Sequence, residues 1–372
     1  MATSRSTRVI VGLSGGVDSA VTALLLRDAG YEVHGLYMSN WDAEDAYCTS
    51  AQDYQDARAV ASDLGIVLHR VSFAEEYRQQ VFDSMLADYR AGRTPNPDVL
   101  CNRHIKFGLC LRYAARLGGS VFATGHYARL TQAADGPALL QARDELKDQT
   151  YFLHSIEYAT LGHVLFPLGD LTKSEVRERA RRAGLAVHDK PDSTGICFIG
   201  EQPFGQFLGR FIEPRPGPIE TLDGQVLGQH RGLHFHTLGQ RAGLAIGGAR
   251  GRAQEPWYVA LKDQPRNALI VVQRGDQHRL EAAELDTAPL NWLGAPRTGA
   301  FEAQIRLRHR QPLQSARVSV RPEGGAHIEF EQPQRAATPG QFAVIYQQGR
   351  CLGGGAIERV LLVGQARYNP AA

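Results

Sequence analysis

The stretch GLSGGVDSAV, residues 12–21, follows the apolar run RVIVGL at residues 8–13 and leads into a helical pattern at residues 18–30. The apolar run predicts a buried strand, and the small residues after it let the backbone wrap closely around an anion. A helix start offers unpaired N–H groups and the positive end of the helix dipole to that anion. We therefore predict an anion-binding turn between the first strand and the first helix.

This turn differs from the two common nucleotide loops, because it has no lysine after its glycines and no G-x-G-x-x-G pattern. The complete string S-G-G-x-D-S resembles instead the pyrophosphatase loop of enzymes that cleave ATP between its α and β phosphates. Asp18 could place Mg²⁺ or cap the helix, and a helix entry that is merely rich in small residues is the alternative. The residues expected to hold the nucleotide are Gly12, Leu13, Ser14, Gly15, Gly16, Val17, Asp18 and Ser19.

Strand and helix patterns alternate from residue 8 to residue 125. This alternation predicts an α/β fold with a doubly wound parallel sheet, whose ligands bind at the carboxyl ends of the strands. Met38 ends the second expected strand and could lie near an adenine, although a core position explains it almost as well. Gly125 follows a later strand, where it could admit a ligand or simply make a turn.

The texture of the sequence changes after about residue 205. Residues 217–230 and 255–273 each have the pattern of a hairpin, the first with Asp-Gly at its turn. From residue 279 onward, short alternating strands predict a small β-barrel or sandwich. We therefore divide the chain into a catalytic domain at 1–204, a central linker domain at 205–278 and a C-terminal β-barrel at 279–372.

The composition limits the classes of protein. The chain has 372 residues, a formal net charge of +2 and five cysteines, which are scattered without a C-x-x-C pair. We expect no structural disulfide framework and no zinc or iron–sulfur site. The first residues have no apolar signal segment and no run is long enough to span a bilayer, so we expect a cytoplasmic protein that needs no membrane. The small net charge means that nucleic-acid binding would need local basic surfaces.

The segment NPDVLCNRHIKFG, residues 96–108, places Cys101 near Arg103, His104 and Lys106. Two prolines predict a loop between helices here. Neighbouring cations favour thiolate, so Cys101 is a candidate nucleophile, with an inert buried thiol as the alternative. Asp98 could move a proton or be a turn residue.

Other candidates have weaker local signals. From its surroundings alone Cys197 is expected in a core, and Cys110 lies on the apolar face of a helix. The triplet Lys147, Asp148 and Gln149 is typical of a capped helix start. Arg306, Arg308 and Arg310 would share one face of a strand, either to contact phosphates or as a solvated edge.

Several distinctive strings occur in one order along the chain, namely VGLSGGVDS, TPNPDVLCN, DQTYFL, GICFIG, HTLGQRAGL and GQFAVIY. Together they resemble the family of bacterial-type tRNA-specific 2-thiouridylases nearly from end to end. The resemblance implies an ATP pyrophosphatase domain of the adenine nucleotide α-hydrolase type, a small central domain and a tRNA-binding barrel. It implies a tRNA-uridine sulfurtransferase that adenylates the C2 oxygen of the wobble uridine and then transfers sulfur from a cysteine persulfide.

The same resemblance assigns roles to residues. It implies that residues 12–19, Met38 and Gly125 bind ATP with Mg²⁺, that Cys101 is the nucleophile, and that Cys197 carries the persulfide and pairs with Cys101 in a transient disulfide. It gives Asp98 the acid–base role. The residues implied to contact tRNA are Asn96, Pro97, Asp98, Lys147, Asp148, Gln149, Arg308 and His309, the last standing where the family often has tyrosine. The implied partners are tRNA, a persulfide-donating sulfur carrier or cysteine desulfurase, and a thiol reductant.

Three other functions share parts of this pattern. An adenylating synthetase or ligase of small molecules has the same loop but needs neither a cysteine pair nor an RNA-binding barrel. A tRNA thiolase with an iron–sulfur cluster would need the paired cysteines that this sequence lacks. A non-catalytic RNA-binding thiol-switch protein would have no use for an intact nucleotide loop.

Overall fold

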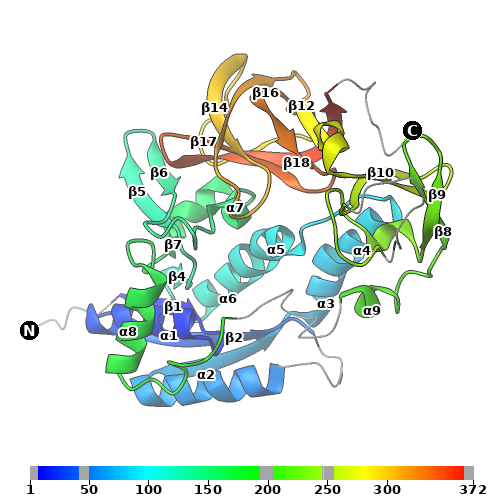
Figure 1. Ribbon diagram of the computed structural model, residues 1–372. Coiled ribbons are helices and arrows are strands. Elements are labelled where there is room, and N and C mark those ends of the chain that lie inside the picture. Colours follow the sequence, from blue (N-terminus) through cyan, green and yellow to red (C-terminus); the bar gives the residue numbers. More distant parts are fainter. Residues whose placement is uncertain (1–6, 42–49, 193–203, 245, 247–254, 364–372) are drawn as a thin grey trace, which may run out of the picture.

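The computed structural model describes residues 7–41, 50–192, 204–244, 246 and 255–363. Its described residues form three sheets, shown in Figure 1: a parallel sheet near the N-terminus, a small sheet in the middle of the chain, and a large antiparallel sheet near the C-terminus. An α/β part followed by β structure is the fold class that the sequence predicted. The domain boundaries at residues 204 and 278 stay a prediction.

The first sheet has the strand order β3-β2-β1-β4-β7, and every pairing in it is parallel. The central strand β1 therefore has β2 on one side and β4 on the other, which is the arrangement that opens a ligand crevice at the carboxyl ends. Its strands are β1 (Arg8–Gly12), β2 (Glu32–Ser39), β3 (Val67–Ser72), β4 (Val121–Ala123) and β7 (Val164–Leu165).

Helices cover both faces of this sheet, as Figure 1 shows for α2 on one side and α5 and α6 on the other. Alternate side chains of β1 point to opposite faces: Val9 and Val11 pack with residues of α1, α2 and α8, whereas Ile10 packs with residues of α4, η2 and β4. The helical segments are α1 (Val17–Asp28), α2 (Ser50–Leu64), α3 (Ala74–Tyr77), η1 (Arg78–Phe82), α4 (Asp83–Arg90), α5 (Pro97–Leu100), η2 (Cys101–Cys110), α6 (Leu111–Arg116), α7 (Thr150–Leu153), η3 (Tyr158–His163), α8 (Lys173–Arg182) and α9 (Phe204–Leu208).

The loop predicted around Cys101 is wrong. Pro97 is the first residue of α5, a position where proline is tolerated because its missing N–H would be unpaired there anyway. The chain then continues without a break through the π-helical segment η2 into α6. Cys101 therefore lies on a helix, and the prolines mark where that helix begins.

The middle sheet consists of two hairpins, as predicted. Strand β8 (Gly217–Thr221) pairs with β9 (Val226–His230), and β10 (Tyr258–Asp263) pairs with β11 (Ala268–Val272), both antiparallel. A parallel pairing of β11 with β8 joins the two hairpins into one sheet. Its buried side chains, such as Ile219, Val259 and Leu269, form a core of their own.

The strands from β12 to β18 in the C-terminal sheet close into a ring, because β12 pairs with both β16 and β18. Closure of this kind is what defines a β-barrel, so the predicted barrel is confirmed. The strands are β12 (Glu281–Thr287), β13 (Asn291–Trp292), β14 (Ala300–Arg306), β15 (Gln314–Val320), β16 (Ala326–Arg335), β17 (Phe342–Gln347) and β18 (Arg350–Leu362).

An unexpected hairpin joins the first part of the chain to the barrel. Strands β5 (Arg129–Ala133) and β6 (Gly136–Leu140) extend the C-terminal sheet through antiparallel pairing of β6 with β18. Leu139 and Cys351, which face each other in this register, are both fully buried. A segment that follows β4 in the chain is thus part of the C-terminal sheet, held there by backbone hydrogen bonds and by side-chain packing.

Within the part of the chain that the structure describes, every helix is too short or too polar to cross a membrane.

Candidate active site

Three of the predicted nucleotide positions meet at one edge of the parallel sheet. Gly12 ends β1, Met38 lies at the end of β2, and Gly125 follows β4 by two residues. Since β1 pairs in parallel with both β2 and β4, the carboxyl ends of the three strands lie side by side. A β-carbon on Gly125 would lie 2.9 Å from the backbone carbon of Asp18, so this glycine lets the β4 end approach the loop closely.

The loop between β1 and α1 is held by its own hydroxyl groups. Ser19 donates to the carbonyl oxygen of Gly16 at 3.0 Å and accepts from the backbone N–H of Ser14 at 3.2 Å. Gly16 stands at the helix N-cap, where no side chain caps the first turn of α1. The dipole of this twelve-residue helix therefore ends at a turn made of small residues, which suits a phosphate group.

Charged residues that the sequence analysis did not single out surround the loop. Lys173, at the start of α8, donates to both carboxylate oxygens of Asp18, at 2.8 and 2.9 Å. The hydroxyl of Tyr127 donates to Asp18 as well, at 3.0 Å. Lys190 donates to the carbonyl oxygen of Gly15 at 3.1 Å and forms ion pairs with Asp53 and Asp56. The one sequence signal near Lys173 is the helix-capping residue Thr172 directly before it, which predicts a helix start and gives no sign of a contact with Asp18.

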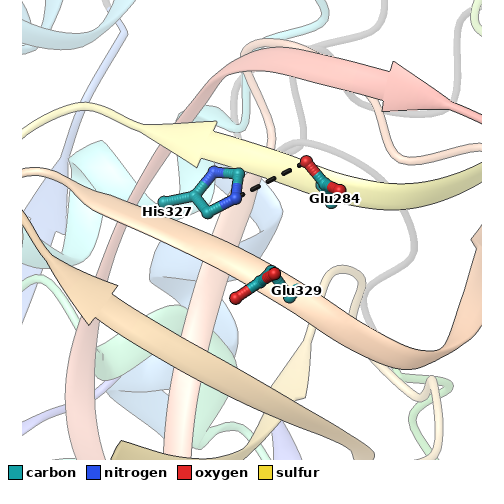
Figure 2. Close-up of side chains that lie close together, drawn as sticks. All are labelled: Glu284, His327 and Glu329. Atoms are coloured by element: carbon teal, nitrogen blue, oxygen red, sulfur yellow. Dashed lines mark ion pairs between the residues drawn. The ribbon is translucent and has the colours of Figure 1, made fainter. Parts of the chain in front are cut away.

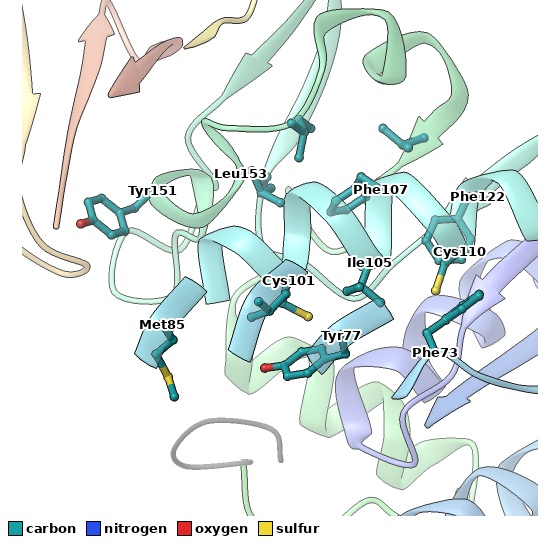
Figure 3. Close-up of a cluster of buried hydrophobic side chains, with 14 of the residues drawn as sticks. Phe73, Tyr77, Met85, Cys101, Ile105, Phe107, Cys110, Phe122, Tyr151 and Leu153 are labelled. Carbon is teal, nitrogen blue, oxygen red and sulfur yellow. The ribbon is translucent and has the colours of Figure 1, made fainter. Parts of the chain in front are cut away.

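Cys101 is the first residue of η2 and is only 3% exposed. Figure 3 shows it with Cys110 among the labelled apolar side chains of the cluster that fills this face of the sheet. Cys110 behaves as predicted for a core residue: burial raises the pKa of its thiol, and its Sγ lies 3.3 Å from Met38 Sδ. Met38 therefore has a core contact in addition to its place at the strand end. Cys197 lies outside the described residues.

Asp98 lies three residues before Cys101 on the same continuous helix, in α5. Burial raises the pKa of its carboxyl, and the positive charge of Lys106 acts in the opposite direction. A carboxyl whose pKa is raised holds a proton more readily than an exposed one, which is the direction that a proton-transfer role requires. Of the three cations predicted around Cys101, Arg103 is exposed, whereas Lys106 is half-buried and acts on both Asp98 and Cys110.

The segments predicted to contact tRNA come together around α7, although they lie far apart in the sequence. His309 Nε2 lies 3.1 Å from the carbonyl oxygen of Asp148, and its ring packs against Phe152 at 4.6 Å between centroids. Asn102, next to Cys101, donates to the carbonyl oxygen of Phe152. The structure therefore brings residues 96–102, 147–152 and 308–309 into one neighbourhood.

Two of these side chains point inward. Asp148 is 1% exposed, and its carboxylate accepts from Arg306 at 2.6 Å and from the hydroxyl of Thr150 at 2.9 Å. Gln149 accepts from the backbone N–H of Tyr127 at 2.9 Å. Lys147, which is half-buried, pairs with Asp192 at 2.7 Å. The triplet is thus tied into the protein.

The predicted row of arginines on one strand face is wrong. Strand β14 ends at Arg306, which is buried, and the chain then turns through Arg310, whose φ is +66°. Arg308 Nη2 donates to the carbonyl oxygens of Ala336, at 2.6 Å, and Leu238. Of the three side chains only that of Arg310 is exposed, so they form no continuous phosphate-binding surface.

A group of possible metal ligands lies elsewhere, on the barrel. Figure 2 shows Glu284 on β12 and His327 and Glu329 on β16, with the dashed line marking the His327–Glu284 ion pair at 3.5 Å. His327 Nδ1 also lies 2.8 Å from the buried carboxylate of Asp286. Cross-strand ion pairing on a partly exposed surface accounts for this group.

Comparison with known proteins gives two sets of names. Family models described as a tRNA methyl transferase HUP domain, a tRNA methyl transferase PRC-barrel domain and an aminomethyltransferase β-barrel domain match residues 7–201, 205–273 and 282–357. Curated relatives carry the name tRNA-specific 2-thiouridylase MnmA. That of Hahella chejuensis is 50% identical over 363 residues, 97% of this chain and 100% of the relative. That of Halorhodospira halophila is 52% identical over 94% of this chain and 93% of the relative. The two sets of names differ in the group transferred, methyl or sulfur.

Proposed function

The chain belongs to the tRNA-specific 2-thiouridylase family, and from that premise we propose that it replaces the C2 oxygen of the wobble uridine of tRNA with sulfur at the expense of ATP. Membership of a family of tRNA sulfurtransferases rests on identity of about one half over nearly the whole chain. The observation that carries the ATP-dependent mechanism is the uncapped helix α1 behind a glycine-rich turn, at the edge where β1, β2 and β4 end.

ATP is proposed to bind along this edge. The turn at residues 12–19 would hold the phosphate groups through backbone N–H groups and the hydroxyls of Ser14 and Ser19, while Met38 and Gly125 would border the adenosine. Mg²⁺ is proposed to accompany the nucleotide, and Asp18 would supply a carboxylate to hold it. The support is the fit of a small, positively polarised turn to an anion, because ATP carries its charge on the phosphates.

The chemistry requires activation because the uracil C2 oxygen is a poor leaving group. We propose that this oxygen attacks the α phosphorus of ATP and that pyrophosphate leaves, which turns the oxygen into part of an AMP leaving group. Asp98 would give or take the proton that moves in this exchange, and its raised pKa supports that role. The uridine must leave the anticodon stack to reach Asn96, Pro97 and Asp98.

Sulfur is proposed to come from a persulfide on Cys197. The terminal sulfur could bond to C2 as AMP leaves, after which the Cys101 thiolate attacks the inner sulfur and releases the thiolated base. Alternatively, Cys101 attacks the inner sulfur first and frees hydrosulfide, which then bonds to C2. Both routes end in a Cys101–Cys197 disulfide, so a thiol reductant must restore the two thiols and a persulfide donor must reload Cys197. This need for reduced thiols supports a cytoplasmic location.

The structure limits the tRNA-contacting role that we propose for five residues, namely Lys147, Asp148, Gln149, Arg308 and His309. The buried carboxylate of Asp148 and the inward hydrogen bonds of Gln149 and Arg308 favour a role in shaping the surface around α7. Lys147, Gln149, Arg308 and His309 are all partly exposed, so contact with RNA stays proposed for these four residues.

Product analysis tests the proposal. The protein is incubated with ATP, Mg²⁺, a persulfide donor, a thiol reductant and unmodified tRNA, and the nucleosides are identified by mass spectrometry. We expect 2-thiouridine together with equal amounts of AMP and pyrophosphate. ADP in place of AMP would exclude adenylation, and a methylated nucleoside formed with a methyl donor would favour the activity named in the family models. ATP turnover that needs no tRNA would favour a small-molecule synthetase.

The loop geometry predicts a large effect of Gly15→Ala. Gly15 has φ +77°, and a β-carbon there would lie 2.3 Å from the backbone oxygen of Asp53. We expect the affinity for ATP to fall by at least about tenfold, which corresponds to about 1.4 kcal/mol. Gly30→Ala is the matched control, since Gly30 has φ +86° with open space around it. It shares the backbone strain of about 1–2 kcal/mol but should bind ATP normally, as measured by calorimetry. Equal ATP affinity in the two variants would contradict a phosphate site at this turn.

A further inference from the structure

Lys173 is fixed at the nucleotide turn by the fold around it. It is the first residue of α8, where Thr172 and Glu175 form a capping box and Asp144 accepts from the Lys173 backbone N–H at 2.9 Å. Its side chain is 13% exposed, and its ammonium group pairs with Asp18 at 2.8 Å and Asp192 at 2.7 Å. A lysine that reaches 155 residues back along the chain to the turn is thus held in place at both its backbone and its side chain.

Lys173 shares its carboxylate partner Asp192 with two other cations. Asp192 also pairs with Lys147 at 2.7 Å and Arg177 at 2.9 Å, so three cationic side chains share the carboxylates of Asp18 and Asp192. Burial acts to raise the pKa of Asp192, but the hydrogen bonds of Lys147 and Lys173 bring it down to about 2. Lys190, on the other side of the turn, pairs with two different carboxylates, those of Asp53 and Asp56.

The position of Lys173 relative to the sheet suggests which part of a nucleotide it meets. Met38, the candidate for the adenine end, lies on β2, on one side of β1. The hydrogen bond between Tyr127 and Asp18 lies beside Lys173 and connects the turn to the chain that follows β4, on the other side of β1. A nucleotide laid across the end of β1 would therefore present its phosphate end to Lys173. The turn itself contains no lysine, whereas the lysine of the G-x-x-x-x-G-K-[ST] loop reaches the β and γ phosphates.

On the basis of the proposed function, we propose that Lys173 binds the β and γ phosphates of ATP and then the pyrophosphate that leaves. Asp18 and Asp192 hold its ammonium group in the absence of nucleotide. Binding of the polyphosphate exchanges these carboxylate partners for phosphate oxygens. The lysine absent from the turn in the sequence is thus supplied by α8.

Binding measurements test the assignment independently of thiolation. For Lys173→Met we expect the affinities for ATP and for inorganic pyrophosphate, measured by calorimetry, to fall roughly 10- to 100-fold, since a hydrogen bond to a charged group is lost. The affinity for AMP should change by less than about twofold because AMP lacks the contacted phosphates. Lys173→Arg should recover most of the pyrophosphate affinity. Arg182→Met, which removes a cation paired with Glu178 on the exposed side of the same helix, should change none of these affinities.

A second variant separates phosphate binding from simple neutralisation of Asp192. If Lys173 only neutralised that carboxylate, Lys173→Met with Asp192→Asn would restore pyrophosphate binding; we expect that it does not. Restored binding, an equal loss for AMP, or unchanged ATP and pyrophosphate affinities would each overturn the assignment. Wild-type protein that binds pyrophosphate through Lys173 yet leaves tRNA unthiolated would refute the proposed function alone. Wild-type protein that binds neither ATP nor pyrophosphate would refute both.

Discussion

Cys101→Ser is expected to bring tRNA thiolation below detection, a loss of roughly 10³-fold or more, with ATP binding unchanged. A serine hydroxyl neither ionises near neutral pH nor forms a disulfide, so it can neither attack a persulfide nor release the thiolated base. Single-turnover assays of 2-thiouridine with a persulfide-loaded enzyme measure this step directly. Cys197→Ser should show the same loss because the scheme needs both thiols.

Cys110→Ala is the matched control for this prediction. Cys110 ends the same π-helical segment that Cys101 begins, and it is 1% exposed. Burial raises the pKa of its thiol and keeps it neutral, so we expect thiolation to continue in this variant. Thiolation by Cys101→Ser at one tenth or more of the wild-type rate would refute the two-thiol scheme. If Cys110→Ala abolished thiolation as completely as Cys101→Ser does, the loss in both variants would be explained by disturbed packing.

The turn and its strand were predictable because their signals are local. A run of apolar residues before Gly12 and a cluster of small residues after it already determine a buried strand and a tight turn. The barrel was predictable from the alternating strands after residue 279 for the same reason, because the alternation of apolar and polar residues is visible within each single strand. The closure through β12 and β18 depends on the whole sheet and was predicted only as a class of fold.

The features that were missed depend on contacts between distant residues or on small differences in helix geometry. Lys173 and Asp18 are 155 residues apart, and nothing in either neighbourhood indicates the other. The hairpin of β5 and β6 pairs with a strand more than two hundred residues later. The prolines at 95 and 97 suggested a loop, yet Pro97 begins a helix that continues into a π-helical segment with Cys101 and Ile105 buried.

The buried pair of Asp148 and Arg306 connects the segment before α7 with the barrel. Asp148 is 1% and Arg306 6% exposed, and the two residues are 158 positions apart in the chain. The carboxylate accepts from the backbone N–H groups of Ala142 and Thr150 in addition to Arg306. The guanidinium group lies 5.3 Å from the ring centre of Tyr346, and its Nε makes no hydrogen bond. The buried positive charge of Arg306 is therefore compensated by the carboxylate of Asp148.

Asp148→Asn should lower the free energy of unfolding by about 3–5 kcal/mol, because it leaves the Arg306 charge buried without its carboxylate and turns an amide N–H₂ toward other donors. Urea unfolding measures this loss. Asp28→Asn, the same substitution at the exposed pair with Arg27, is the control and should cost less than about 1 kcal/mol. Adding Arg306→Met to Asp148→Asn should recover part of the stability, since no buried charge then remains. A loss at Asp148 no larger than at Asp28 would contradict a buried ion pair. It would instead support a solvent-facing Asp148 available to tRNA.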